Sequence, residues 1–143
     1  MKQQLSEHFS LEELIHSATA TARGICNQPY GEAVSNLQNL CQQVLEPLRT
    51  FAGQPVVISS GYRCHALNRA VGGAKGSQHC RGEAADIAIP DIATGRRWFE
   101  WIRHNCPFDQ LIWEQKGGKT WIHVSCRRQD DKNRKQVMTI RKP

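Results

Sequence analysis

The spacing of apolar residues in the first third of the chain predicts helices. In the stretch 32–49, apolar residues recur every three or four positions, as on the buried face of a helix. A shorter helix is expected from 11 to about 18, because Ser10 and Glu13 match a capping box. An irregular connection, 19–31, joins the two, and Pro47 is expected to kink or end the longer helix.

After residue 55 the pattern changes to short β-branched or alternating runs, which predict strands. Strands are expected at 56–59, 84–89, 110–114 and 121–125, with a hairpin turn at 115–119 and a last strand at 137–140. Two helices, 65–71 and 94–105, interrupt them. Because helices come first and strands cluster late, we expect an α+β fold in which N-terminal helices pack on a central antiparallel sheet.

The length of 143 residues suits one domain, 1–143. Within it we expect a helical N-terminal part (1–50), a catalytic core (56–126) and a basic C-terminal segment (127–143). No apolar run approaches the roughly 20 residues that a membrane helix needs, so no membrane span is expected. We expect the protein to be a monomer.

The net charge of +6 is concentrated at the C-terminus, where residues 127–143 contain seven basic and two acidic side chains. The rest of the chain is nearly neutral, and no aromatic residues alternate with the C-terminal charges as in a nucleic-acid surface. We therefore expect a solvated terminal segment and no nucleic-acid partner. Attraction to an anionic surface such as a bacterial wall stays open.

The residues from Ser77 to Asp86 carry the most chemical information. His79 and Asp86 lie seven positions apart, with Gly82 between them for a turn. Zinc binds imidazole nitrogen and carboxylate oxygen, and a catalytic zinc site uses three protein ligands and keeps one position open. These two residues therefore predict two ligands of a zinc site. Cys80 is a rival ligand, because zinc also accepts thiolate. In an extended segment its side chain would point away from that of His79, so we expect Cys80 to be a packing residue.

The third ligand is expected on the strand 121–125. Alternation there puts His123 on the face opposite Ile122 and Val124, so the strand can bury its apolar face and direct His123 to a cleft. The same reasoning on the preceding strand exposes Glu114, whose carboxylate could reach a metal-bound water. The other histidines (His8, His16, His65 and His104) have no ligand-like companions in the sequence and are expected on the surface or on helices.

These residues resemble one known family. The run from Ser77 to Asp86 is similar to the S-x-H-x-x-G-x-A-x-D signature of the zinc D-alanyl-D-alanine peptidases, whose fold is shared with Hedgehog signalling domains. The segments 60–63, 67–68, 109–114 and 121–125 match as well. The likeness covers most of the chain and is greatest to a short, single-domain branch common in phages and prophages.

The resemblance implies one Zn²⁺ ion held by His79, Asp86 and His123. It also implies that Arg63 contacts the substrate or stabilises transition-state charge, and that Ser77 is a nearby substrate-binding residue. A structural salt bridge from Arg63 to Asp86 or Glu83 is the competing interpretation.

The sequence departs from the family at the general base. Many relatives have a glutamate three residues before the last histidine, or a second histidine two residues before it. This chain has Thr120 and Trp121 at those positions. We therefore predict that Glu114 and Arg63 are the catalytic residues, with Glu114 as the base.

The expected function is hydrolysis of peptide bonds in peptidoglycan stem peptides or cross-links, with D-alanyl bonds favoured. An L-alanyl-D-glutamate endopeptidase of the phage lysin type and a non-catalytic zinc-containing wall-binding module stay open as alternatives. The first residues lack the pattern of a secretory signal. We expect synthesis in the cytoplasm and action on the wall after release or delivery by a route that the sequence does not indicate.

Overall fold

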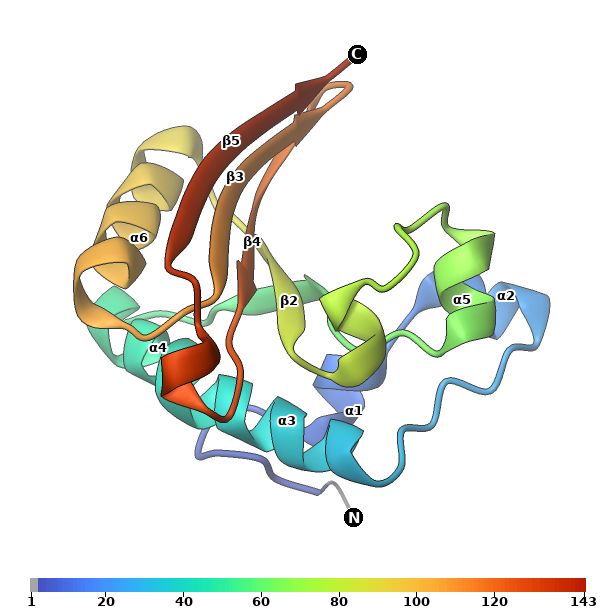
Figure 1. The fold of residues 1–143 in the computed structure, drawn as a ribbon. Coiled ribbons are helices and arrows are strands. Elements are labelled where there is room, and N and C mark those ends of the chain that lie inside the picture. Colours follow the sequence, from blue (N-terminus) through green and yellow to red (C-terminus); the bar gives the residue numbers. More distant parts are fainter. Residues whose placement is uncertain (1–2) are drawn as a thin grey trace.

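The computed structural model describes residues 3–143, with helices early in the chain and strands late (Figure 1). The predicted α+β class is confirmed. In chain order the elements are α1 (Leu11–Ile15), α2 (Ala18–Arg23), α3 (Glu32–Leu40), the π-helical turn η1 (Cys41–Leu45), α4 (Glu46–Ala52), β1 (Val57–Ser60), α5 (His65–Ala70), the 3-10 turn η2 (Gln78–Arg81), β2 (Ala84–Ala88), α6 (Ile92–Asn105), β3 (Gln110–Lys116), β4 (Lys119–Ser125), the 3-10 turn η3 (Asp130–Lys132) and β5 (Gln136–Lys142).

The strands form one sheet in the order β1-β2-β4-β3-β5. The pairs β1·β2, β2·β4 and β3·β4 are antiparallel, as expected from the sequence. The last strand pairs with β3 in parallel, so the sheet is mixed and not wholly antiparallel. The cause is the connection through η3: it returns the chain to the start of β3, and a strand that begins there must run in the same direction.

Helix α6 covers one face of the sheet (Figure 1). Phe99 on this helix meets Trp113 of β3 edge to face, with ring centroids 5.8 Å apart. Alternation along β4 buries Ile122 and Val124 in the same apolar cluster. The opposite face is thereby left for polar side chains of β2, β3 and β4.

The structure corrects two N-terminal predictions. The segment expected to be irregular contains α2, whose first turn is capped by Ser17 and which ends at Gly24 in the left-handed region. Of the two effects expected of Pro47, a kink or an end, the end does not occur there, because the helix continues to Ala52. Proline has no N–H and crowds the carbonyl one turn earlier; the wider π-helical turn η1, directly before α4, accommodates both effects.

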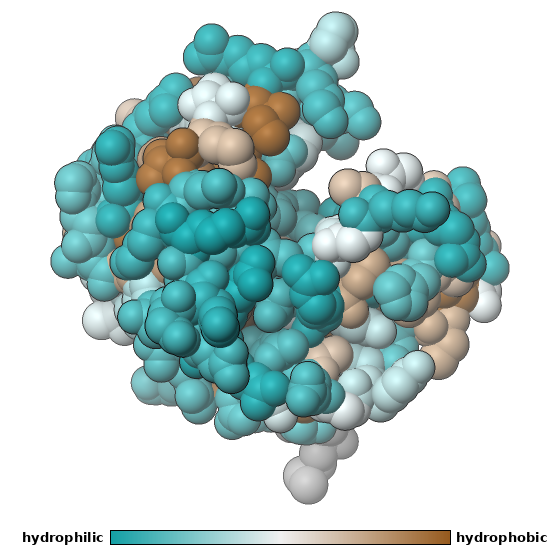
Figure 2. Space-filling view, in the orientation of Figure 1, coloured by the Kyte–Doolittle hydropathy of each residue, from teal (hydrophilic) through white to brown (hydrophobic). Residues whose placement is uncertain are grey.

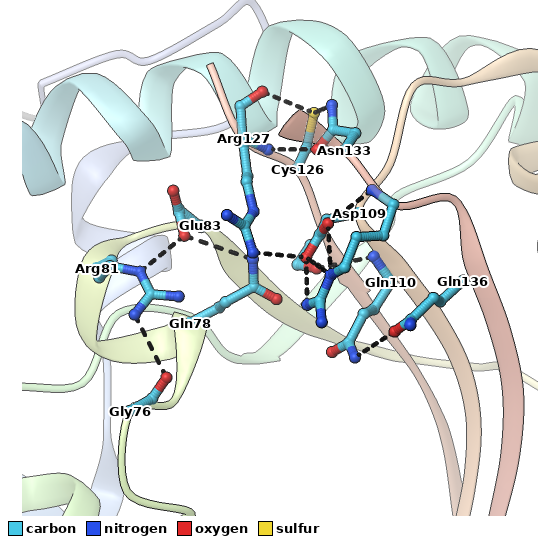
Figure 3. A network of polar contacts seen from close by, with 12 residues as sticks. Gly76, Gln78, Arg81, Glu83, Asp109, Gln110, Cys126, Arg127, Asn133 and Gln136 are labelled. Carbon is cyan, nitrogen blue, oxygen red and sulfur yellow. Dashed lines mark hydrogen bonds and ion pairs between the residues drawn. The ribbon is translucent and has the colours of Figure 1, made fainter. Parts of the chain in front are cut away.

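The basic C-terminal segment is exposed over most of its length, as expected, while its backbone is anchored to the sheet. Asp109, fully buried just before β3, accepts hydrogen bonds from the Arg134 backbone N–H at 2.8 Å and from its Nη2 at 2.7 Å. Arg127 Nη2 lies 3.4 Å from the same carboxylate (Figure 3). Although burial opposes ionisation, these partners lower the pKa of Asp109 to about 2. The buried carboxylate therefore fixes the start of β5 beside β3.

Within residues 3–143, no helix is both long and apolar enough to cross a membrane.

Candidate metal centre and active site

His79 is held rigidly by the turn η2. The Ser77 hydroxyl accepts the backbone N–H of His79 at 3.2 Å, and Gly82, at φ 76°, ends the turn. A Cβ at position 82 would come within 2.4 Å of the Ala33 carbonyl oxygen, so glycine is required. The His79 ring is buried, and its Nδ1 donates to the Gly61 carbonyl oxygen at 2.7 Å. A carbonyl oxygen can only accept, so the free lone pair of the neutral ring is on Nε2.

Asp86 and His123 face each other from neighbouring strands, in direct register between β2 and β4. Nδ1 of His123 lies 3.0 Å from Oδ1 of Asp86, and Nε2 of His79 lies 3.4 Å from the same oxygen. One donor atom from each residue lies within 4.8 Å of the others. The structure thus brings together the three ligands predicted from the sequence, which are called the triad below.

The donor set of the triad fits a divalent metal. Although burial opposes ionisation, His123 and His79 lower the pKa of Asp86 well below its usual range by hydrogen bonding and charge. Nδ1 of His123 and Oδ1 of Asp86 are 3.0 Å apart, and a metal that binds such a pair displaces any proton that they share. Two imidazole nitrogens and one carboxylate oxygen are ligands that zinc accepts.

Glu114 lies beside the triad on β3. It is two residues beyond Ile112, the register partner of His123, and therefore points to the same face of the sheet. Its Oε1 is 3.9 Å from Nδ1 of His123. Burial, and then the negative charge of Asp86, raise the pKa of Glu114. A raised carboxyl pKa suits a group that accepts and returns a proton near neutral pH.

Arg63 comes from the loop between β1 and α5 and is held by two side chains. Its Nε donates to Ser60 Oγ at 3.1 Å and its Nη1 to Asn68 Oδ1 at 3.0 Å. Its Nη2 is 3.6 Å from Oδ2 of Asp86. The competing salt-bridge interpretation therefore holds in part, while Glu83 pairs instead with Arg81. The predicted role of Arg63 toward a substrate stays a prediction.

Two pockets flank the triad. The larger, about 580 Å³, has Arg63, Asp86 and Trp121 in its wall. The smaller, about 280 Å³, has Ser77 and His123 in its wall. Figure 2 shows the surface notched between the strands and the region of α5, with largely hydrophilic walls. The triad is therefore open to a ligand from two sides.

Two other sequence predictions change in the structure. Cys80 lies in a 3-10 turn and not in an extended segment, and burial raises the pKa of its thiol, which disfavours the thiolate that metals bind. His8 was expected to have no ligand-like companions, but Glu7 and Glu46, remote from each other in sequence, lie close to it.

Sequence reasoning missed the supports of these residues. The Gly61 carbonyl that orients His79 is a backbone atom, and no residue type signals it. Asn68, which holds Arg63, belongs to a segment that matches the family, so its position did carry a signal.

Together, the His-Asp-His triad, with His79 and Asp86 buried and His123 half-buried, the neighbouring carboxylate and the open cleft have the arrangement expected of a metal-dependent hydrolase site. The family model for peptidase M15 matches residues 7–125. The chain therefore belongs to the peptidase M15 family. Among curated proteins, none matches the chain.

Proposed function

We propose that this protein is a zinc metallopeptidase that hydrolyses peptide bonds of bacterial peptidoglycan, with D-alanyl bonds of stem peptides or cross-links as the favoured targets. The proposal rests on one observation: donor atoms of His79, Asp86 and His123 meet within 4.8 Å at an open cleft. Membership of the peptidase M15 family supports the peptidase chemistry. The resemblance of segments 77–86 and 121–125 to the zinc D-alanyl-D-alanine peptidases supports the substrate.

Each residue of the site has a distinct task in this proposal. His79, Asp86 and His123 hold the zinc ion, which when bound polarises the scissile carbonyl and lowers the pKa of water. Glu114 accepts a proton from the attacking water and returns it to the leaving amine.

Arg63 and Ser77 would bind the substrate on the two sides of the triad. The Arg63 guanidinium, oriented by Ser60 and Asn68, would hold a substrate carboxylate or the developing oxyanion. Ser77 is in the wall of the smaller pocket, where its hydroxyl can meet the peptide.

Two alternatives use the same residues. An L-alanyl-D-glutamate endopeptidase would require the same metal and base, and only the cleaved bond would differ. A non-catalytic wall-binding module would keep zinc without cleaving a bond. The carboxylate of Glu114, 3.9 Å from Nδ1 of His123 and at the side of the triad, favours a catalytic site over that module, because a binding module has no need of a base there.

The test compares wild type with Glu114→Gln on purified sacculi and muropeptides, with and without a chelator. Glu114→Gln should retain zinc and lose about 10²- to 10⁴-fold in turnover, because loss of a general base costs that much. The matched control is Glu100→Gln, on the outer side of α6, which should keep full activity.

Mass spectrometry of the released fragments identifies the bond. Loss of terminal D-alanine or opening of cross-links supports the favoured target, and cleavage after L-alanine supports the alternative. Stoichiometric zinc with no cleavage of any wall type would reject the peptidase in favour of the binding module.

A further inference from the structure

The smaller pocket beside the triad is basic. Besides His123, its wall includes Lys75, Arg81 and Arg134, which come from three separate parts of the chain, and no acidic side chain among the described residues lines it. A pocket that adjoins a metal donor and gathers cations is suited to an anionic part of the same ligand.

The charges of this pocket are not fully neutralised by partners. Arg81 is paired with Glu83 at 2.9 Å. Arg134 shares the single carboxylate of Asp109 with Arg127. The two guanidinium groups of Arg127 and Arg134 and the one carboxylate of Asp109 therefore keep a net positive charge.

Lys75 is the cation best placed to act on a ligand. It is exposed, in the loop between α5 and η2, and within residues 3–143 its ammonium group has no hydrogen bond or ion pair. An ammonium without a protein partner can pair with an incoming carboxylate without breaking a contact inside the protein, and it gives up only water.

Two amides complete the lining. Gln110 donates through Nε2 to Gln136 at 3.0 Å, and Gln78 is 3.4 Å from Glu83 through its own Nε2 (Figure 3). Each amide thus points its NH₂ group to a protein partner, which fixes its orientation at the pocket wall. The cations carry the anion preference, and the amides shape the site around it.

We infer that this pocket is a carboxylate subsite, which binds a carboxylate of the peptide next to the scissile bond and makes Lys75 a specificity-determining residue. The inference rests on the proposed peptidase function. One cation of the pocket, Arg134, lies beyond the residues 7–125 that the family model matches. The carboxylate is either the C-terminus of the substrate or that of an internal acidic residue.

The test measures kcat/KM for two pairs of stem peptides. In one pair the C-terminal carboxylate is free or amidated; in the other an internal carboxylate is free or amidated. Wild type should prefer the acid in one pair by about fivefold, the size expected for a solvent-accessible ion pair. The preference should shrink as salt is raised.

Lys75→Gln should reduce that preference to near unity, while the control Lys116→Gln, at the exposed end of β3, should keep it. The pair in which the preference depends on Lys75 identifies the source of the carboxylate. An unchanged preference in Lys75→Gln would overturn the subsite. Because the Lys75 side chain is exposed and has no hydrogen bond or ion pair with the residues that the structure describes, we expect this variant to fold as wild type does.

Calorimetric titration of zinc-loaded Glu114→Gln with the same peptides separates this inference from the proposed function. If no peptide is cleaved by wild type, but binding prefers the acid and loses that preference with Lys75→Gln, the peptidase proposal fails and the subsite stands. If binding shows no acid preference, the subsite fails whether or not cleavage occurs.

Discussion

Two groups of histidine and carboxylate side chains in this protein bring their potential donor atoms equally close together, yet the surroundings of only one of the two suit a metal ion. The triad and the cluster of Glu7, His8 and Glu46 each place three potential donor atoms within 4.8 Å. Both also adjoin a pocket, since His8 lines one of about 520 Å³. Proximity and available space therefore do not distinguish them.

The two groups differ in the hydrogen bonds that their donor atoms already make within the protein. In the cluster, Oε1 of Glu46 already accepts the Ser6 hydroxyl at 2.6 Å and the His8 backbone N–H at 2.8 Å, and Oε2 contacts the His8 ring. Glu7 and His8 are exposed to water. These contacts tie the N-terminal segment to α4 and leave few lone pairs for an ion.

In the triad, Nδ1 of His79 is occupied by the Gly61 carbonyl oxygen, and that contact directs Nε2 toward Asp86 and the ligand side of the site. His79 and Asp86 are also buried, so an ion there would meet little competing water. The comparison teaches that the supports of the donors, and not their number, define a metal site.

The largest effect should come from removing one donor of each group. His123→Ala should lower zinc affinity by more than about 100-fold, because loss of an outer partner alone costs 10- to 100-fold. His8→Ala should leave zinc stoichiometry unchanged. Zinc content after dialysis, measured by mass spectrometry of the metal, checks both variants; equal zinc in the two would remove the distinction drawn here.

A smaller effect should come from disturbing the support of His79 alone. In Gly61→Ala the added Cβ would come within 2.2 Å of the Leu14 carbonyl oxygen, so the loop that presents the Gly61 carbonyl must move. We expect zinc affinity to fall by about 10- to 100-fold. Competition with a chromogenic chelator measures the zinc affinity.

The control for that variant is Gly118→Ala, because a Cβ at Gly118 meets nothing within 4 Å and its φ is not positive. Thermal denaturation of both metal-free proteins separates a loss of affinity from a loss of stability. A Gly61→Ala protein that binds zinc as tightly as wild type would show that the carbonyl contact does not orient His79.

The same contrast explains how much of the site the sequence could reveal. His123 was predictable because alternation along a strand assigns each side chain to a face, and Glu114 followed by the same rule. The Gly61 carbonyl was not predictable, because any residue type supplies a carbonyl oxygen. That Lys75 and Arg134 line the same pocket was not predictable either, because the pairing of β5 with β3 is what brings Arg134 to that pocket.

In the fold, too, the elements that depend on local sequence were predictable, and those that depend on distant contacts were not. Helix α6 and the hairpin of β3 and β4 depend on local periodicity and were predicted closely. The parallel direction of β5 depends on the buried pairing of Asp109 with Arg134, 25 positions away in sequence, which no local pattern encodes. Helix α2 had a signal that was missed: Ser17 and Gly24 are good end residues for a helix, but the short run between them has weak helical character.

The smallest effect concerns the cluster and should appear in stability, not in zinc binding. Although burial opposes ionisation, hydrogen bonds from Ser6 and His8 lower the pKa of Glu46 below its ordinary value of 4.5. Because the carboxyl is more acidic in the folded protein, its stabilisation is complete above pH 4.5 and is lost as the pH falls through the folded-state pKa.

Glu46→Gln should therefore cost about 1 kcal/mol of unfolding free energy at neutral pH, the usual contribution of such hydrogen bonds. The difference from wild type should vanish in acid, and urea denaturation across this pH range measures it. Glu7→Gln, an exposed member of the same cluster, should track wild type throughout. If zinc binding changed in Glu46→Gln while stability did not, the two groups would have to exchange the roles assigned to them here.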